Sequence, residues 1–98
     1  MAGGWVYIMA NRPNGALYVG VTSDPAKRIW EHRTGAVAGH TARYGLKLLV
    51  HLEEHAAMPL AIQREKTIKH WPRQWKVNLI EAGIPTWQDL FERYFGRE

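Results

Sequence analysis

Two short apolar runs, rich in aromatic residues and separated by a turn sequence, constrain the fold of this chain more than any other feature. Residues 5–9 read WVYIM and residues 17–21 read LYVGV, with Pro-Asn-Gly at 13–15 between them. Runs of β-branched and aromatic residues that flank a Pro/Asn/Gly cluster are typical of a β-hairpin. The sequence therefore predicts two adjacent antiparallel strands near its N-terminus.

A helix is predicted directly after this hairpin. Ser23 or Asp24 is a suitable N-cap, Pro25 suits the first helical position, and Gly35 suits the position just past the end. Ile29 and Trp30 are the large apolar residues of this segment, and we expect both in the core.

One further strand and three further helices are predicted after a loop. Residues 36–45 are small and polar and indicate a surface loop, whereas 46–52 alternate in part, as in a strand. The next helix begins at Pro59 and ends before Trp71-Pro72.

A helix over 74–82 should face inward with Trp75, Leu79 and Ile80. Residues 86–89 (TWQD) resemble a capping box that starts a final helix. The element order ββαβααα predicts an α+β fold with a small, mostly antiparallel three-stranded sheet flanked by helices.

Length and composition favour one domain over residues 1–98. A chain of 98 residues suits one modest core, and the absence of cysteine excludes disulfides and thiolate metal sites. No apolar run is long enough to span a bilayer and no signal-peptide pattern is present, so we expect a cytoplasmic protein with no membrane association.

Positive charge is concentrated in the middle of the chain. The net charge is +4 with a pI near 9.7. Five cations are opposed locally only by Glu65: Arg64, Lys66, Lys69, Arg73 and Lys76. This layout favours a polyanionic partner such as nucleic acid, although charge that merely keeps a protein soluble is an alternative.

The hairpin and the helix after it resemble the GIY-YIG endonuclease superfamily, in particular its small stand-alone members. Val6-Tyr7 and Tyr18-Val19-Gly20 resemble the two sequence blocks that give the superfamily its name. Arg28 and His32 stand where that family keeps its catalytic arginine and a frequent histidine. Valine replaces isoleucine in both blocks and Trp5 replaces the first glycine, but the tyrosines are kept. The resemblance covers nearly the whole chain and implies the family's α+β fold.

Glu65 is notable without any family knowledge. At 100° per residue it lies about 60° from both Ile62 and Ile68, in the middle of an apolar stripe. A carboxylate there must be paired, protonated or bound to a cation. An ion pair is one interpretation. The resemblance implies the other, a ligand for Mg²⁺ or another divalent cation such as Mn²⁺, which keeps several waters and needs few protein ligands.

Arg28 and His32 are four residues apart and therefore project from one face of their helix. Arg28 is either a solvated charge paired with Glu31 or, as the resemblance implies, the group that binds the scissile phosphate and stabilises its developing charge. His32 has an ordinary pKa near neutrality and could orient or deprotonate a hydroxyl.

Tyr7 and Tyr18 could lie side by side on the two strands of the hairpin. Cross-strand aromatic pairs are a common packing device, so a structural role is one interpretation. The resemblance implies that a tyrosine of these blocks is the general base for the attacking water. We assign that role to Tyr18, with Tyr7 supporting it, while Gly20 lets other groups approach closely.

The remaining candidates are weaker. Asn78 falls near the family's active-site asparagine but could be a solvated helix residue. Loop residues and the basic patch are candidate nucleic-acid contacts: His40, Thr41, Tyr44, Arg64, Lys69, Arg73 and Lys76. Trp71 and Trp75 lie between the basic residues as potential stacking platforms, but we expect both in the core of so small a domain.

The resemblance implies a metal-dependent endonuclease that hydrolyses phosphodiester bonds in nucleic acid, most plausibly in DNA of particular structure during repair or recombination. With no room for an added DNA-binding domain, specificity would come from substrate shape or a protein partner. The alternative is a module that binds nucleic acid or protein on the same fold without cleavage.

Overall fold

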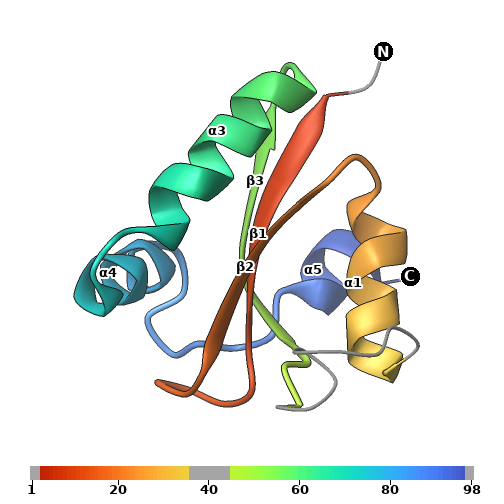
Figure 1. The fold of residues 1–98 in the computed structure, drawn as a ribbon. Helices are drawn as coiled ribbons and strands as arrows, with labels where there is room; N and C mark the ends of the chain where they lie inside the picture. Colours follow the sequence, from red (N-terminus) through yellow and green to blue (C-terminus); the bar gives the residue numbers. More distant parts are fainter. Residues whose placement is uncertain (1–2, 36–44, 97–98) are drawn as a thin grey trace.

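The predicted hairpin forms two of three strands in an antiparallel sheet. In the computed structural model, which describes residues 3–35 and 45–96, β1 (Gly4–Ala10) pairs with β2 (Leu17–Thr22) on one side and β3 (Leu48–His55) on the other. The N-terminal strand is therefore central and β2 is at an edge (Figure 1). The register sets Tyr7 opposite Gly20 on β2 and opposite Leu52 on β3.

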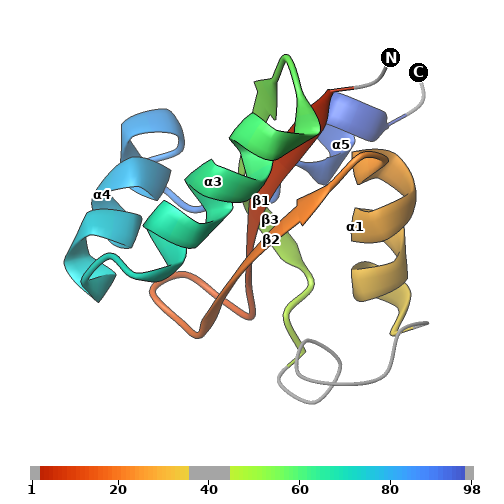
Figure 2. The same ribbon diagram turned by 45° about the horizontal axis from the view of Figure 1, so that its top comes forward.

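Helices cover both faces of this sheet. The helices of the described residues are α1 (Pro25–Thr34), α3 (Met58–Lys69), α4 (Arg73–Gly83) and α5 (Phe91–Phe95). Two views agree that α3 and α4 lie on one side and α1 and α5 on the other (Figures 1 and 2). The predicted α+β architecture is confirmed. No helix in residues 3–35 and 45–96 is long and apolar enough to cross a membrane.

Local signals account for α1. Asp24 is the N-cap, with its Oδ1 accepting a hydrogen bond from the Lys27 amide at 3.3 Å, and Pro25 occupies the first turn. Gly35 ends the helix in the left-handed region at φ 74°, where the absence of a Cβ removes the steric penalty.

The central strand supplies most of the core. Residues 6–10 are at most 1% exposed, so β1 is covered on both faces. Ile29 of α1 packs from one side, and Ala61 and Ile68 of α3 are buried on their helix. The site described below is thus attached to the most deeply buried strand of the described chain.

Three predicted core residues are instead exposed. Trp30 is 53% exposed because the buried stripe of α1 is Pro25, Ile29 and His32, and a residue 100° away from Ile29 points to solvent. Ile62 is 38% exposed. Trp75 is 55% exposed because α4 turns other residues, Val77 and Ile80, toward the sheet.

The last helix was predicted to start at residues 86–89, and this start is wrong. α5 begins at Phe91, and Trp87 has a positive φ of 61° that no helix allows. Asp89 does not complete a capping box, because its Oδ1 accepts hydrogen bonds from the amides of Leu49 at 3.1 Å and Phe91 at 3.0 Å. This carboxylate ties the C-terminal segment to β3. The third strand also runs later than predicted, from 48 to 55.

Candidate active site

The phenol of Tyr7 lies directly over Gly20 of the neighbouring strand. A Cβ placed on Gly20 would be 2.4 Å from both Cζ and the hydroxyl oxygen of Tyr7, far inside contact distance. Tyr7 itself is 1% exposed. The missing side chain of Gly20 therefore makes the space that the tyrosine ring occupies.

His32 holds the end of this phenol. Its Nε2 and the Tyr7 hydroxyl are 2.9 Å apart, and both residues are buried. The ring of Tyr18 completes the group, with its centroid 6.2 Å from that of Tyr7 and 5.6 Å from that of His32. We call Tyr7, Tyr18 and His32 the tyrosine–histidine cluster. Tyr18 is half-buried and is the part of the cluster nearest to solvent.

Arg28 lies one helical turn before His32 and borders the cluster. It interacts with the Tyr7 phenol, which raises the pKa of the guanidinium. Its Nη1 is also 3.3 Å from Glu31 Oε1, the ion pair expected for a solvated arginine. Arg28 and Glu31 line an open hollow of about 340 Å³ together with Thr22, Asp24 and Lys27. An anion that enters this hollow meets a permanently charged guanidinium.

Tyr7 and His32 are both uncharged at neutral pH because they are buried. Burial, and then the neighbouring Tyr18, raise the pKa of Tyr7 to about 12, although Arg28 opposes this. The pKa of His32 is lowered by its burial and by the charge of Arg28. The hydrogen bond between Tyr7 and His32 therefore joins two neutral groups.

Glu65 is buried on α3 as predicted, but on a stripe with Ala61 and Ile68 and without Ile62, and it is ion-paired. It is 7% exposed and its Oε2 lies 2.6 Å from the Nζ of Lys69, one turn along the helix. This contact raises the pKa of Lys69. The charge of Glu65 adds to the rise in the pKa of Tyr7, and Tyr18 adds to that of Lys69, so the α3 pair acts electrostatically on the tyrosines.

Among the described residues, the donor set at Glu65 fits a strongly hydrated cation. In residues 3–35 and 45–96, no three histidine or acidic side chains are grouped so as to hold a metal ion, which rules out a cage of protein ligands there. One buried carboxylate that already holds the ammonium of Lys69 is a ligand that Mg²⁺ could take, since Mg²⁺ keeps several waters. Lys69 is half exposed on a flexible stem and can leave.

Several predicted site residues lie elsewhere. Asn78 is exposed on α4, accepts a hydrogen bond from Gln74 at 2.9 Å, and shares a surface hollow with Trp71, Trp75 and Leu79 rather than contacting the cluster. The loop candidates fall outside the described residues: His40, Thr41 and Tyr44.

The basic residues proposed for nucleic-acid contact are mostly engaged within the protein. The Arg73 Nη2 donates to the carbonyl oxygen of Asn14 at 2.9 Å, which links α4 to the hairpin turn. Lys69 contacts Glu65, and Arg64 contacts Glu53. Lys76 is half-buried on α4.

The sequence analysis did not identify a polar cluster on β3 that is centred on the carboxylate of Glu53. Glu53 accepts from Arg64 Nε at 2.8 Å and contacts the Nε2 atoms of His51 at 2.8 Å and His55 at 2.7 Å. Burial alone would raise the pKa of Glu53, but these three partners outweigh it and lower the pKa to about 2. The alternation His-x-Glu-x-His on a strand puts all three side chains on one face, which is the signal that was available.

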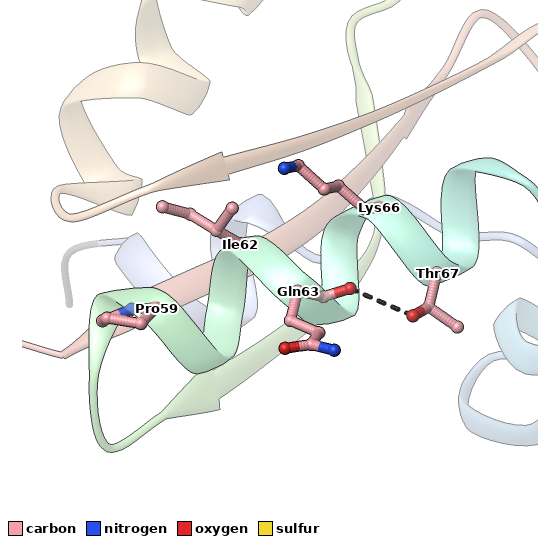
Figure 3. Close-up of a pocket in the computed structure, with 5 residues that line it drawn as sticks. All are labelled: Pro59, Ile62, Gln63, Lys66 and Thr67. Carbon is pink, nitrogen blue, oxygen red and sulfur yellow. Dashed lines mark hydrogen bonds between the residues drawn. The ribbon is translucent and has the colours of Figure 1, made fainter.

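Another hollow belongs to α3 and lies apart from these groups. It has a volume of about 520 Å³ and is lined by one stripe of that helix (Figure 3): Pro59, Ile62, Gln63, Lys66 and Thr67. The Thr67 hydroxyl donates to the backbone carbonyl of Gln63 at 3.0 Å. None of these side chains is a base or nucleophile in a buried setting, so this hollow offers no catalytic chemistry.

Comparisons with known proteins identify the family and the fold. Residues 3–78 match the model of the GIY-YIG catalytic domain. A UPF0213 protein of Pseudomonas aeruginosa is 31% identical over 88 residues, which are 90% of this chain and 84% of that protein. A UPF0213 protein of Staphylococcus haemolyticus is 36% identical over 81 residues, 83% of this chain and 98% of that protein. The solution NMR structure of a UPF0213 protein from Bacillus halodurans is similar with a TM-score of 0.55 and 27% identity, over 91% of this chain and 94% of the other.

Proposed function

This chain belongs to the GIY-YIG family, among its UPF0213 proteins, and from that premise we propose that it is a metal-dependent endonuclease that hydrolyses phosphodiester bonds in DNA. One observation carries the proposal. Tyr7, Tyr18, His32 and Arg28 come from three elements and meet around Gly20, and Arg28 also lines an open hollow with Asp24, Lys27 and Glu31. Simple packing of the hairpin would not require a buried histidine hydrogen-bonded to the central tyrosine.

Arg28 would bind the scissile phosphate. Its guanidinium remains charged at every relevant pH, and its planar donors match two phosphate oxygens. Binding the phosphate would compete with Glu31, whose contact with Arg28 at 3.3 Å is partly exposed and therefore weak. As negative charge grows on the phosphate oxygens in the transition state, the fixed guanidinium stabilises it more than it stabilises the ground state.

The general base is better assigned to Tyr18 than to Tyr7. With a pKa of about 12, Tyr7 is ionised in only about one molecule in 10⁵ at pH 7. Tyr7 is also fully buried, so water cannot reach its hydroxyl, whereas Tyr18 is half-exposed. In this arrangement Tyr7 and His32 hold the Tyr18 ring in position, and Tyr18 takes the proton of the entering water.

Glu65 would hold the divalent cation, Mg²⁺ or Mn²⁺, after Lys69 leaves its carboxylate. When bound, such a cation supplies positive charge to the leaving 3′ oxygen. The ammonium of Lys69 would then be available to a phosphate oxygen of the substrate. Selectivity for branched, nicked or damaged DNA, and a role in repair, are further parts of the proposal, as is a protein partner that adds specificity.

A module that binds nucleic acid without cleaving it is the second candidate. The observation that favours it is the ion pair itself, because Lys69 neutralises the carboxylate that a nuclease needs for its metal. The two candidates differ in whether cleavage depends on Mg²⁺ and on Glu65.

The test is nicking of supercoiled plasmid and cleavage of a branched DNA, with Mg²⁺ and with chelator. Wild type is compared with Glu65→Gln, which keeps the side chain's shape but removes its charge, and with Lys69→Gln. We expect Mg²⁺-dependent product from wild type and Lys69→Gln and none from Glu65→Gln. Gel-shift binding should be retained in Glu65→Gln and weakened in Lys69→Gln, which loses a phosphate contact. Equal cleavage by Glu65→Gln would remove Glu65 from the site, and binding without cleavage by wild type would favour the binding module.

A further inference from the structure

Trp75 is a large apolar side chain that the fold leaves in solvent. It is 55% exposed on the outer face of α4, opposite the buried residues Val77 and Ile80. It shares an open hollow of about 430 Å³ with Trp71, Asn78 and Leu79. A domain with so small a core gains stability by burying tryptophan, so an exposed one calls for another explanation.

The ring of Trp75 is held in a fixed orientation. It meets Trp71 edge to face, with centroids 5.9 Å apart and planes at 70°. Trp71 in turn lies under the Arg64 guanidinium, 5.2 Å from the ring centre, and Arg64 is fixed by Glu53 at 2.8 Å. This chain of contacts explains the Glu53 cluster on β3. These contacts orient the Trp75 ring, and the outward face of that ring is left open to solvent.

The segment of sequence that carries this ring has the same net charge as the whole chain. Residues 64–76 contain five cations and one carboxylate, a net charge of +4, which equals that of the chain, so the remaining residues hold eight charges of each sign. Glu53 offsets Arg64 from outside the segment. The excess that remains favours an occupant that bears negative charge next to an aromatic face.

We propose that Trp75 is a stacking platform for an unpaired nucleobase, with the phosphates beside that base held by the cations of α3 and α4. The proposal rests on the nuclease function proposed above and deepens it, because it makes the substrate a nucleic acid with a single-stranded segment next to the scissile bond. Bases inside a duplex present no free face, so only unpaired nucleotides can use the platform.

A hydrogen bond links the helix that carries the platform to the hairpin that carries Tyr18. Arg73, at the start of the helix that carries Trp75, is bonded to the turn between β1 and β2, a few residues before Tyr18. Lys69, four residues before Arg73, is paired with the buried Glu65 of α3. A strand bound along this route would run from the tyrosine–histidine cluster past Lys69 to Trp75.

The experiment measures binding in chelator, so that no cleavage occurs. Fluorescently labelled oligothymidine and a blunt duplex of the same length are titrated with wild type, Trp75→Ala and Trp30→Ala. Trp30 is the matched control, since it is 53% exposed but lies on α1, across the sheet. We expect Trp75→Ala to weaken binding of the single strand roughly 5- to 150-fold, with less than about twofold change for duplex, and Trp30→Ala to change neither.

Three results would overturn the proposal. Equal losses in Trp75→Ala and Trp30→Ala would indicate a general effect, and equal losses on single strand and duplex would indicate an electrostatic contact without stacking. Wild type that sediments as a dimer, with Trp75→Ala a monomer, would assign the hollow to a second copy of the chain. Cleavage is scored separately: if wild type cuts nothing but Trp75→Ala still loses the single strand, the platform stands and the nuclease function fails.

Discussion

Replacing Gly20 with alanine tests whether the space under Tyr7 organises the candidate active site. The new Cβ would lie 2.4 Å from Cζ and from the hydroxyl, where carbon atoms normally stay about 3.5–4.0 Å apart, so the ring must move by about 1 Å or more. Tyr7 is fully buried, and its neighbours leave little room for such a shift.

The expected loss of stability follows from two terms. Overpacking of this kind costs about 1–3 kcal/mol, and losing the hydrogen bond between Tyr7 and His32 costs a further ~1 kcal/mol. Alanine restricts the unfolded chain more than glycine does, which offsets about 0.5–1 kcal/mol of this loss of stability. The net loss is about 1–3.5 kcal/mol, equivalent to a fall in Tm of about 4–28 °C for a domain of this size.

Urea denaturation measures the free energy of unfolding, and a double-mutant cycle assigns its cause. In a Tyr7→Leu background the ring is gone, so Gly20→Ala should cost less than about 1 kcal/mol there, a coupling of about 2 kcal/mol. Gly83→Ala is the control, because no atom lies within 4 Å of its added Cβ. Equal costs of Gly20→Ala in both backgrounds would refute the reasoning.

Two further predictions follow from the cluster and from β3. Tyr18→Phe should abolish Mg²⁺-dependent cleavage at all pH values while Tyr7→Phe only slows it, as measured by plasmid nicking; the reverse order would make Tyr7 the base. Glu53 has a folded pKa of about 2 against 4.5, so its stabilisation is complete above pH 4.5 and is lost as the pH falls toward 2. Urea denaturation of Glu53→Gln at pH 7, 4 and 3 should therefore show about 1–3 kcal/mol less stability at pH 7 and a flatter acid limb, whereas an unchanged acid limb would place the titrating group elsewhere.

The hairpin and α1 could be predicted because their signals are local. A turn sequence, a capping aspartate and a glycine past the helix end act within a few residues. Glu65 could be predicted as a buried carboxylate from its spacing on one helix, and its ion-pair alternative from Lys69 one turn later. Both inferences needed only the geometry of a single element.

The features that could not be predicted from the sequence depend on contacts between elements. α4 carries two apolar stripes, one with Trp75 and one with Val77 and Ile80, and only packing against the sheet decides which is buried. Asp89 has the spacing of a cap but bonds to Leu49 on β3 instead. The position of Tyr7 over Gly20 depends on the register of β1 against β2, and the spacing of residues in the sequence does not determine that register.

The placement of β1 at the centre of the sheet has a consequence for how the protein is made. The ribosome releases the central strand first, and one of its edges is paired by β2 almost at once, but Tyr7 meets its partner on β3 only 45 residues later. At ~5–20 residues per second, an apolar strand edge stays unpaired for several seconds during synthesis. The nascent hairpin is therefore the form of this chain most exposed to aggregation and most in need of a chaperone, and a chain that stops before residue 48 should not fold.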